Sequence, residues 1–144
     1  MGAMSDLPAT VVVAAGVVSA GGRILAARRK TGAHLEGLWE FPGGKLERGE
    51  SPEECLVREF AEELGVRVRA GRILEVIHHR YSDRSVLLLF YACELIEGEP
   101  RPLGCQELRW LGHEELGSLD WVPADLPFVR RLAVEKYSWQ SSRS

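Results

Sequence analysis

Apolar runs alternate with polar and glycine-rich stretches along the chain, and their periods predict several strands and two helices. Strands are predicted over residues 10–19, 23–27, 66–80, 85–95 and 108–111. Turns or loops are predicted at residues 21–22, 28–38 and 82–83, with a short extended piece at 39–41. Helices are predicted over residues 52–64 and 124–137. Because strands and helices interleave without regular alternation, the sequence predicts an α/β fold in which a mixed sheet lies between helices.

The helix predicted over residues 52–64 has start and stop signals at its two ends. Ser51 is a favourable N-cap, Pro52 suits the first helical position, and Glu54 completes a capping box with Ser51. Gly65 supplies the left-handed residue that ends the helix. Apolar residues at four-residue spacing predict one buried stripe, formed by Leu56, Phe60 and Leu64.

The other face of this helix is acidic. Glu59, Glu62 and Glu63 stand at i, i+3 and i+4, so their side chains share one side, and Glu50 just before the helix can join them. Three like charges repel each other unless a cation neutralises them, and Arg58 is the only basic residue close by in this stretch. Mg2+ takes oxygen ligands of this kind and usually also binds substrate phosphates. From this pattern alone, a metal site and an ordinary solvated surface are equally good interpretations.

Length and composition favour one domain over residues 1–144, with loose tails at 1–8 and 138–144. A net charge of −3 argues against a general nucleic-acid binder. The apolar run from Val11 to Val18 is too short to span a membrane and is interpreted as a buried strand. Three cysteines without metal-ligand spacing predict reduced thiols and a cytoplasmic location. A monomer and a homodimer are both compatible with the sequence.

The spacing of residues 44–66 resembles the Nudix box. The specified positions are filled by Gly44, Glu50, Arg58-Glu59-Phe60, Glu62-Glu63 and Gly65-Val66. Chance would produce this spacing at about one starting position in a billion. The resemblance implies one Nudix hydrolase domain, a mixed sheet sandwiched between helices, over residues 1–144. It also implies hydrolysis of a nucleoside diphosphate linked to another group, with Mg2+ as the cofactor and Mn2+ as a substitute ion.

The resemblance extends upstream to residues 39–45, WEFPGGK, which look like the stretch that leads into the box in MutT-type nucleotide pyrophosphohydrolases. Matching positions imply that the carbonyl of Gly43 and the side chains of Glu59 and Glu63 bind metal. Glu62 would share a second ion. Glu59 and Glu62 are both candidates for the base that deprotonates the attacking water, and the sequence leaves the choice open.

Arg58 and Glu50 are assigned to the same catalytic cluster. Arg58 has the wrong charge to bind a cation, and we expect it to pair with Glu50 or Glu62 and to orient the carboxylates. A direct catalytic role for Arg58 is the less favoured interpretation.

Further residues are expected to bind the nucleotide because they match positions in MutT-type enzymes. Arg29 and His34 fall where those enzymes hold nucleotide-contacting residues, and Lys45 ends the WEFPGGK stretch. Without the resemblance, Arg29 and its basic neighbours would be interpreted as a solvated loop. Arg84, with Asp83 before it, matches an aspartate–arginine pair close to the base.

The chain departs from the MutT-like pattern at one position. MutT-like proteins carry an additional acidic metal ligand six residues before the tryptophan of the late strand, and here that position before Trp110 is Gly104. Glu107 lies three residues later and would replace this ligand only if the loop has a different shape. The full number of metal ions is therefore open, although the ligands within the box are present.

Asp125 is the candidate for recognition of the base. It lies in Pro123-Ala124-Asp125-Leu126-Pro127, which resembles the PAD(I/L)P run of the CTP pyrophosphohydrolase branch, whereas MutT has an asparagine there. An ionised aspartate only accepts hydrogen bonds, so it favours the amino group at N4 of cytosine. The alternative is that Asp125 simply caps the last helix, and the two roles can coexist.

These residues predict a nucleoside triphosphate substrate that is hydrolysed to monophosphate and pyrophosphate. Cytosine nucleotides (CTP, dCTP or 5-substituted dCTP) are expected to be preferred. The first alternative is an 8-oxo-dGTP diphosphatase of the MutT type, and other Nudix classes are less favoured because the chain shows no additional motif for them. An alternative of another class is a nucleotide-binding module without activity.

Overall fold

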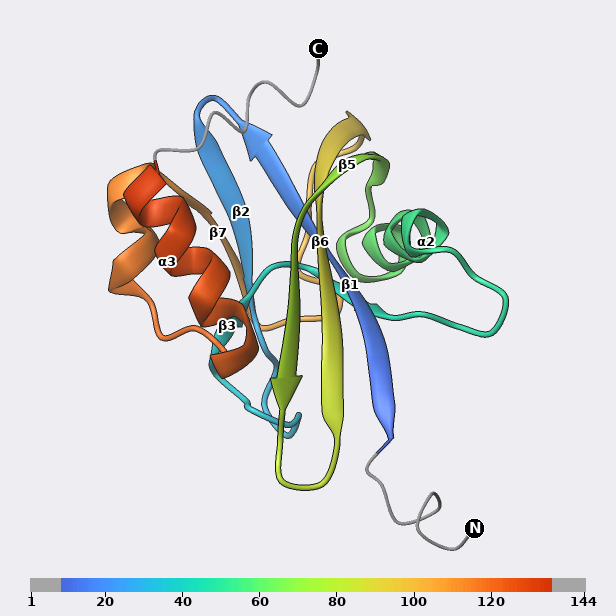
Figure 1. Cartoon of the computed structure of the whole chain (residues 1–144). Helices are drawn as coiled ribbons and strands as arrows, with labels where there is room; N and C mark the ends of the chain where they lie inside the picture. The colour runs from blue at the N-terminus through green and yellow to red at the C-terminus, as the bar shows by residue number, and fades with distance from the viewer. Residues whose placement is uncertain (1–8, 136–144) are drawn as a thin grey trace, which may run out of the picture.

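Strand β1 (Thr10–Ala20) lies in the middle of the sheet in the computed structural model, which describes residues 9–135 (Figure 1). It runs parallel to β6 (Ser85–Glu97) from its first residue to Val18. It also pairs antiparallel with the short strand β4 (Gly43–Lys45). The predicted turn at residues 21–22 then leads into β2 (Arg23–Arg28).

Strand β2 links β1 to the strands on the far side of the sheet from β6. It pairs antiparallel with β3 (Trp39–Glu40) and with β7 (Glu107–Leu111), while β5 (Arg67–Arg80) pairs antiparallel with β6. The order is β3-β2-β1-β6-β5, with β4 attached to β1 and β7 attached to β2. Because β1 and β6 are parallel and the other described pairs of named strands are antiparallel, the predicted mixed sheet is confirmed.

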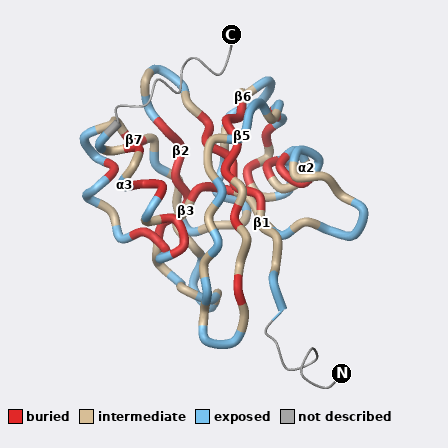
Figure 2. The backbone as a smooth tube through the Cα atoms, in the orientation of Figure 1, coloured by how far each residue is buried: buried red, intermediate tan, exposed pale blue. Residues whose placement is uncertain are grey.

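Helices α2 (Pro52–Leu64) and α3 (Leu126–Glu135) lie on opposite sides of the sheet (Figure 1). Side chains of β1 alternate between the two sides, as the period of a strand requires. Ala14 and Val18 belong to the hydrophobic cluster beneath α2, whereas Ala15 and Val17 belong to the cluster beneath α3. The most buried parts of the chain are these central strands and the inner faces of the helices (Figure 2). The predicted α/β sandwich is therefore confirmed.

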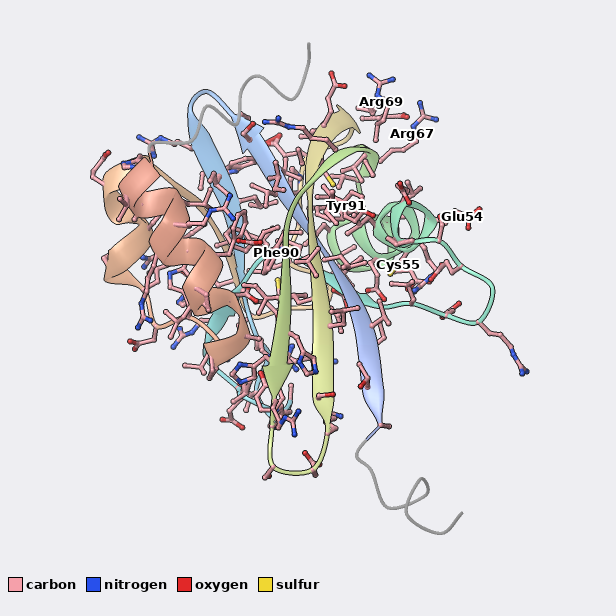
Figure 3. All side chains as sticks on the ribbon, in the orientation of Figure 1. Glu54, Cys55, Arg67, Arg69, Phe90 and Tyr91 are labelled. Carbon is pink, nitrogen blue, oxygen red and sulfur yellow. The ribbon has the colours of Figure 1, made fainter. Side chains whose placement is uncertain are left out.

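The same alternation places neighbouring aromatic residues of β6 on different sides. Phe90 contributes to the cluster beneath α3 and Tyr91 to the cluster beneath α2, where Cys55 also lies (Figure 3). Phe90 is fully buried, and its ring lies 4.4 Å from that of Phe128 on α3, measured between centroids. Aromatic contacts of this kind add to the burial of apolar surface in holding the helix on the sheet.

Helix α2 has the bounds and the caps that the sequence predicts. The hydroxyl of Ser51 accepts a hydrogen bond from the backbone N–H of Glu54, and the Glu54 carboxylate accepts one from the N–H of Ser51. At the other end, Gly65 adopts the left-handed conformation with a φ of 69°. Leu56, Phe60 and Leu64 are buried, so the predicted stripe faces the sheet.

Three elements differ from the prediction. Strand β4 and the 3-10 helix η1 (His113–Ser118) were not predicted, because both are short and lack a clear hydrophobic period. The last helix begins with a 3-10 turn, η2 (Pro123–Asp125), before α3 starts at Leu126. The predicted helix end at Tyr137 and the loose tails at 1–8 and 138–144 lie outside the described residues.

The described residues bear on two sequence expectations, one about membrane-spanning segments and one about the cysteines. Within residues 9–135, no helix is long and apolar enough to cross a membrane. All three cysteines are free: Cys55 and Cys93 are buried and Cys105 is half-buried.

Candidate active site

Gly43 and Gly44 bring the chain after β3 into close contact with both β1 and α2. A Cβ atom at Gly43 would lie 2.0 Å from the carbonyl oxygen of Ala14, and one at Gly44 would lie 2.4 Å from Oε2 of Glu59. Both distances are far shorter than real Cβ contacts. The two glycines therefore allow β4 to lie against β1 and allow the Glu59 carboxylate to lie against the backbone.

Helix α2 directs two of its three predicted metal-binding glutamates into a pocket. Glu59 and Glu63 line this pocket together with Gly43. Glu62 does not line it, and its side chain is 60% exposed where it pairs with Arg58. The structure thus brings Glu59, Glu63 and Gly43 together and places Glu62 outside them.

Arg58 connects the acidic residues around the helix. Its Nε and Nη2 atoms donate to the two carboxylate oxygens of Glu50 at 2.7 and 3.0 Å. Its Nη1 atom donates to Glu59 at 3.0 Å and to Glu62 at 3.2 Å. The expected pairing is therefore present with both Glu50 and Glu62. These hydrogen bonds lower the pKa of Glu50 to about 2, so Glu50 stays ionised as the counter-ion of Arg58.

Glu59 and Glu63 are close enough to influence each other's ionisation. Burial raises the pKa of Glu59, and the hydrogen bond and charge of Arg58 act against this increase. Burial raises the pKa of Glu63 to about 7, and the negative charges of Glu59 and Glu40 contribute to the same shift. Without a cation, the two carboxyl groups therefore hold fewer than two charges near neutral pH.

The donors at this end of the pocket fit a hard divalent cation. Among residues 9–135, no three His, Cys, Asp or Glu side chains form a ready-made metal site. Mg2+, however, is commonly held by one or two carboxylates together with water and substrate phosphates. Glu59 and Glu63 supply two carboxylates, and Gly43 beside them carries a backbone carbonyl. Their assignment as metal ligands stays a prediction.

The pocket has a volume of about 360 Å³, which suits a small-molecule ligand. Its lining includes all of the predicted substrate-binding residues: Arg29, His34, Lys45, Arg84 and Asp125. They come from the loop after β2, from β4, from the β5–β6 hairpin and from η2. The fold therefore gathers residues that are far apart in the sequence around the same cavity as the carboxylates of α2.

Asp125 is held deep in this pocket by a long-range contact. Its side chain is almost completely buried, and Oδ2 accepts a hydrogen bond of 3.1 Å from the backbone N–H of Phe41. This contact with the β3 segment differs from the helix cap that was the alternative. Burial raises the pKa of Asp125 well above its ordinary value, and the nearby charge of Glu40 adds to this. The environment of Asp125 therefore shifts this carboxyl group toward its neutral form. The role of Asp125 in recognition of the base stays a prediction.

Glu40 and Tyr81 are among the lining residues that were not predicted to belong to the site. Glu40 bonds to Arg29 inside the pocket, and Tyr81 lies beside His34 with 5.8 Å between ring centroids. Burial raises the pKa of the Tyr81 hydroxyl. The sequence offered only a weak signal for them: Glu40 lies in the WEFPGGK stretch, and Tyr81 lies three residues before Arg84.

The position that departs from the MutT-like pattern lies directly at the site. Gly104 lines the pocket, and a Cβ atom there would lie 3.0 Å from Cγ of Glu63. Glu107 does not line the pocket. It lies in β7, where its carboxylate is 3.6 Å from both Arg28 and Arg109. The structure therefore does not bring Glu107 to the place of the missing carboxylate.

Comparison with known proteins agrees with this geometry. The NUDIX domain family matches residues 8–132. The chain is 35% identical to the 8-oxo-dGTP diphosphatase of Escherichia coli (strain K12) over 121 residues, which cover 83% of this chain and 94% of that protein. It is 34% identical to the CTP pyrophosphohydrolase of the same organism over 119 residues, which cover 83% and 88%.

Solved structures show the same fold. The E. coli ORF135 protein superimposes with a TM-score of 0.74 at 29% identity and covers 96% of this chain and 98% of its own. The MutT protein of Methanosarcina mazei Go1 superimposes with a TM-score of 0.80 at 21% identity over 91% of this chain and 98% of its own, a likeness in fold. With Gly44, Glu59 and Glu63 of its box lining one pocket and its family match spanning nearly the whole described chain, the protein belongs to the NUDIX domain family and is a Nudix hydrolase.

Proposed function

We propose that this enzyme hydrolyses nucleoside triphosphates to the monophosphate and pyrophosphate with Mg2+ as cofactor. The observation that supports this most is that Glu59, Glu63 and Asp125 line a single cavity. One bound nucleotide could therefore place its phosphates, with a metal ion, at Glu59 and Glu63 and the edge of its base at Asp125. The names of the relatives, a diphosphatase and a pyrophosphohydrolase of nucleoside triphosphates, agree with this reaction.

In this proposal the residues of α2 act at the phosphate end of the substrate. A bound Mg2+ would neutralise phosphate oxygens and favour ionisation of the attacking water. Glu59 is the better placed of the two candidate bases, because it lies in the pocket while Glu62 is exposed outside it. Glu59 would accept the proton as the water oxygen bonds to phosphorus and the phosphoanhydride bond to the leaving group breaks. Arg58 would hold the Glu59 carboxylate in place through its hydrogen bond.

At the other end, we propose that Asp125 binds the base, with cytosine nucleotides (CTP, dCTP and 5-substituted dCTP) preferred. An ionised carboxylate would accept from the amino group at N4 of cytosine, and the neutral form that burial favours would offer one donor beside one acceptor. Cytosine presents the complementary pair, an acceptor at N3 beside the donor at N4. The aspartate in the PADLP run and the similarity to the CTP pyrophosphohydrolase support this choice.

The neutral form of Asp125 would also suit a second candidate substrate, 8-oxo-dGTP. Its base presents an acceptor at O6 beside a donor at N7, which a protonated aspartate can match much as the asparagine of MutT does. Unmodified guanine presents two acceptors at the same edge and is a poorer partner. The similarity to an 8-oxo-dGTP diphosphatase supports this candidate as well.

Catalytic efficiencies on dCTP, 5-methyl-dCTP, dGTP and 8-oxo-dGTP distinguish these candidates. Pyrophosphate release with Mg2+ would be measured for the wild type and for Asp125→Asn. We expect the cytosine nucleotides to lead and dGTP to be slower by about tenfold or more, since one mismatched hydrogen bond in a buried site costs about 1–3 kcal/mol. We expect Asp125→Asn to keep activity and to shift preference toward 8-oxo-dGTP if Asp125 binds the base as an ionised acceptor. An unchanged preference would show that it binds as a neutral carboxyl group, since an amide offers the same donor beside the same acceptor.

Two other outcomes would change the assignment. A lead of tenfold or more for 8-oxo-dGTP in the wild type would assign the enzyme to the MutT type instead. If no triphosphate releases pyrophosphate although nucleotide still binds, the proposed activity is wrong and a binding module is favoured.

A further inference from the structure

Glu40 is a half-buried carboxylate in the pocket for which the proposed reaction has no role so far. It is the last residue of β3, paired with Ala27 of β2, and its side chain is 28% exposed. Both carboxylate oxygens accept hydrogen bonds from Nη1 of Arg29, at 3.1 and 3.2 Å. Because Glu40 sits on a strand of the sheet, it is a fixed partner for a residue in the loop that follows β2.

Arg29 is restrained on a second side by its own loop. Its Nε atom donates to the backbone carbonyl of His34 at 2.5 Å. Among residues 9–135, no hydrogen bond is found for Nη2, and Arg29 lines the pocket. The guanidinium is thus fixed along two edges, and its remaining donors are available to a ligand in the cavity.

We propose that Glu40 is the positioning residue for Arg29, and that the pair directs the free Nη2 donors at an oxygen of the bound nucleotide. This inference rests on the proposed function, since it concerns the same pocket and the same substrate. Arg29 touches the substrate in this scheme, whereas Glu40 acts through Arg29.

The charge balance of the pair explains why a positioning role suits Glu40. An unpaired arginine would attract a triphosphate over a distance, but the Glu40 carboxylate cancels most of this attraction. What remains is a set of oriented donors, and charge-assisted hydrogen bonds of this type depend strongly on direction. Loss of Glu40 should therefore impair the orientation of the substrate more than its capture.

A double-mutant cycle tests the coupling. Arg29→Ala, Glu40→Gln and the double variant would be compared with the wild type for kcat and KM on dCTP and 8-oxo-dGTP with Mg2+. We expect Glu40→Gln to lower kcat about tenfold or more, with KM changed by less than about threefold, because the freed arginine still attracts phosphate. In the Arg29→Ala background, the same Glu40→Gln change should cost less than about twofold.

Thermal unfolding of the same variants provides a readout that does not need activity. Arg29→Ala leaves the Glu40 carboxylate half-buried without its partner and should lower the Tm. Adding Glu40→Gln to that variant should recover part of the loss, whereas Glu40→Gln alone should not raise the Tm. Glu94→Gln is the matched control, since it removes a carboxylate from the exposed ion pair with Arg69 on β5 and β6.

Three outcomes would overturn the proposal, in distinguishable ways. Equal losses of kcat from Glu40→Gln in both backgrounds would show that Glu40 acts without Arg29. A lowered Tm with unchanged kinetics would reduce Glu40 to a structural role. If the wild type releases no pyrophosphate from either nucleotide, the proposed function fails, and the assignment of Arg29 to substrate fails with it.

Discussion

At the scale of single residues, Gly44 sets the position of a carboxylate by having no side chain of its own. The Glu59 carboxylate occupies the space that a Cβ atom at residue 44 would fill, with Oε2 at 2.4 Å and Cδ at 2.5 Å from that point. The neighbour that would have to move is the end of a flexible side chain rather than backbone. The glycine therefore matters more for the site than for the stability of the fold.

We predict that Gly44→Ala lowers kcat by about tenfold or more, because the displaced Glu59 loses its place beside Glu63 and Arg58. The Tm should change by only a few degrees, since the carboxylate can rotate away. Pyrophosphate release and thermal unfolding provide the two measurements. Gly117→Ala is the matched control, because a Cβ atom there meets nothing within 4 Å. A fully active Gly44→Ala enzyme would contradict the importance of this contact.

Residues of the site could be predicted from the sequence where a spacing motif specifies them. The Nudix spacing identified Glu59 and Glu63, and the structure places both in the pocket. Helical spacing put Glu62 on the same face as these two. It could not show that the Glu62 side chain pairs with Arg58 outside the pocket. The raised pKa of Asp125 could not be predicted either, since it depends on burial among distant segments and on the charge of Glu40.

At the scale of elements, helix α2 is seated on the sheet by the ring of Phe60 above Gly16. Phe60 is 1% exposed, and a Cβ atom at Gly16 would lie 2.6 Å from its Cε1 atom. Cys93 of β6 is the next neighbour, at 3.0 Å. There is no free space between strand and helix at this point, so the helix that carries Glu59 and Glu63 is held at a fixed distance from β1.

We expect Gly16→Ala to destabilise the enzyme by about 1–3 kcal/mol, as overpacking of a filled core does. The free energy of unfolding, measured in denaturant at a fixed pH, provides the test. Gly16→Ala should also slow pyrophosphate release, because it shifts the helix that carries Glu59 and Glu63. Adding Phe60→Leu should recover part of this rate, because the smaller side chain lets α2 return toward β1. If Gly16→Ala proves as stable as the wild type, the contact is looser than the structure indicates.

The same elements show what sequence reasoning can reach. The bounds of α2 could be predicted because Ser51, Glu54 and Gly65 are local signals that act within one turn of the helix. Strand β4 could not, because its three residues form a strand only by pairing with residues 13–15 of β1, far away in the chain. The parallel pairing of β1 with β6 is non-local in the same way, although both strands were predicted individually.

At the scale of the whole molecule, the pocket lies where the acidic helix α2 meets the β-sheet. Ionisation of the carboxyl groups that line this pocket affects the stability of the entire chain. The net charge is −3, and a group of carboxylates adds local repulsion to this. Glu63 has a pKa of about 7 in the folded protein against an ordinary value of 4.5. A raised pKa in the folded state stabilises the fold while the group is protonated in both states, below about pH 4.5. This contribution is lost as the pH rises through about 7.

We therefore predict that Mg2+ stabilises the enzyme more at about pH 8 than at about pH 6, because the cation must displace the proton on Glu63 at the lower pH. Without metal, Glu63→Gln should be more stable than the wild type at about pH 8, and the difference should shrink toward about pH 5. Thermal unfolding with a chelator and with Mg2+ measures both effects. Glu53→Gln is the control, since Glu53 is exposed on the same helix. An equal Mg2+ effect at both pH values would show that Glu63 does not ionise on metal binding, and would remove it from the predicted ligands.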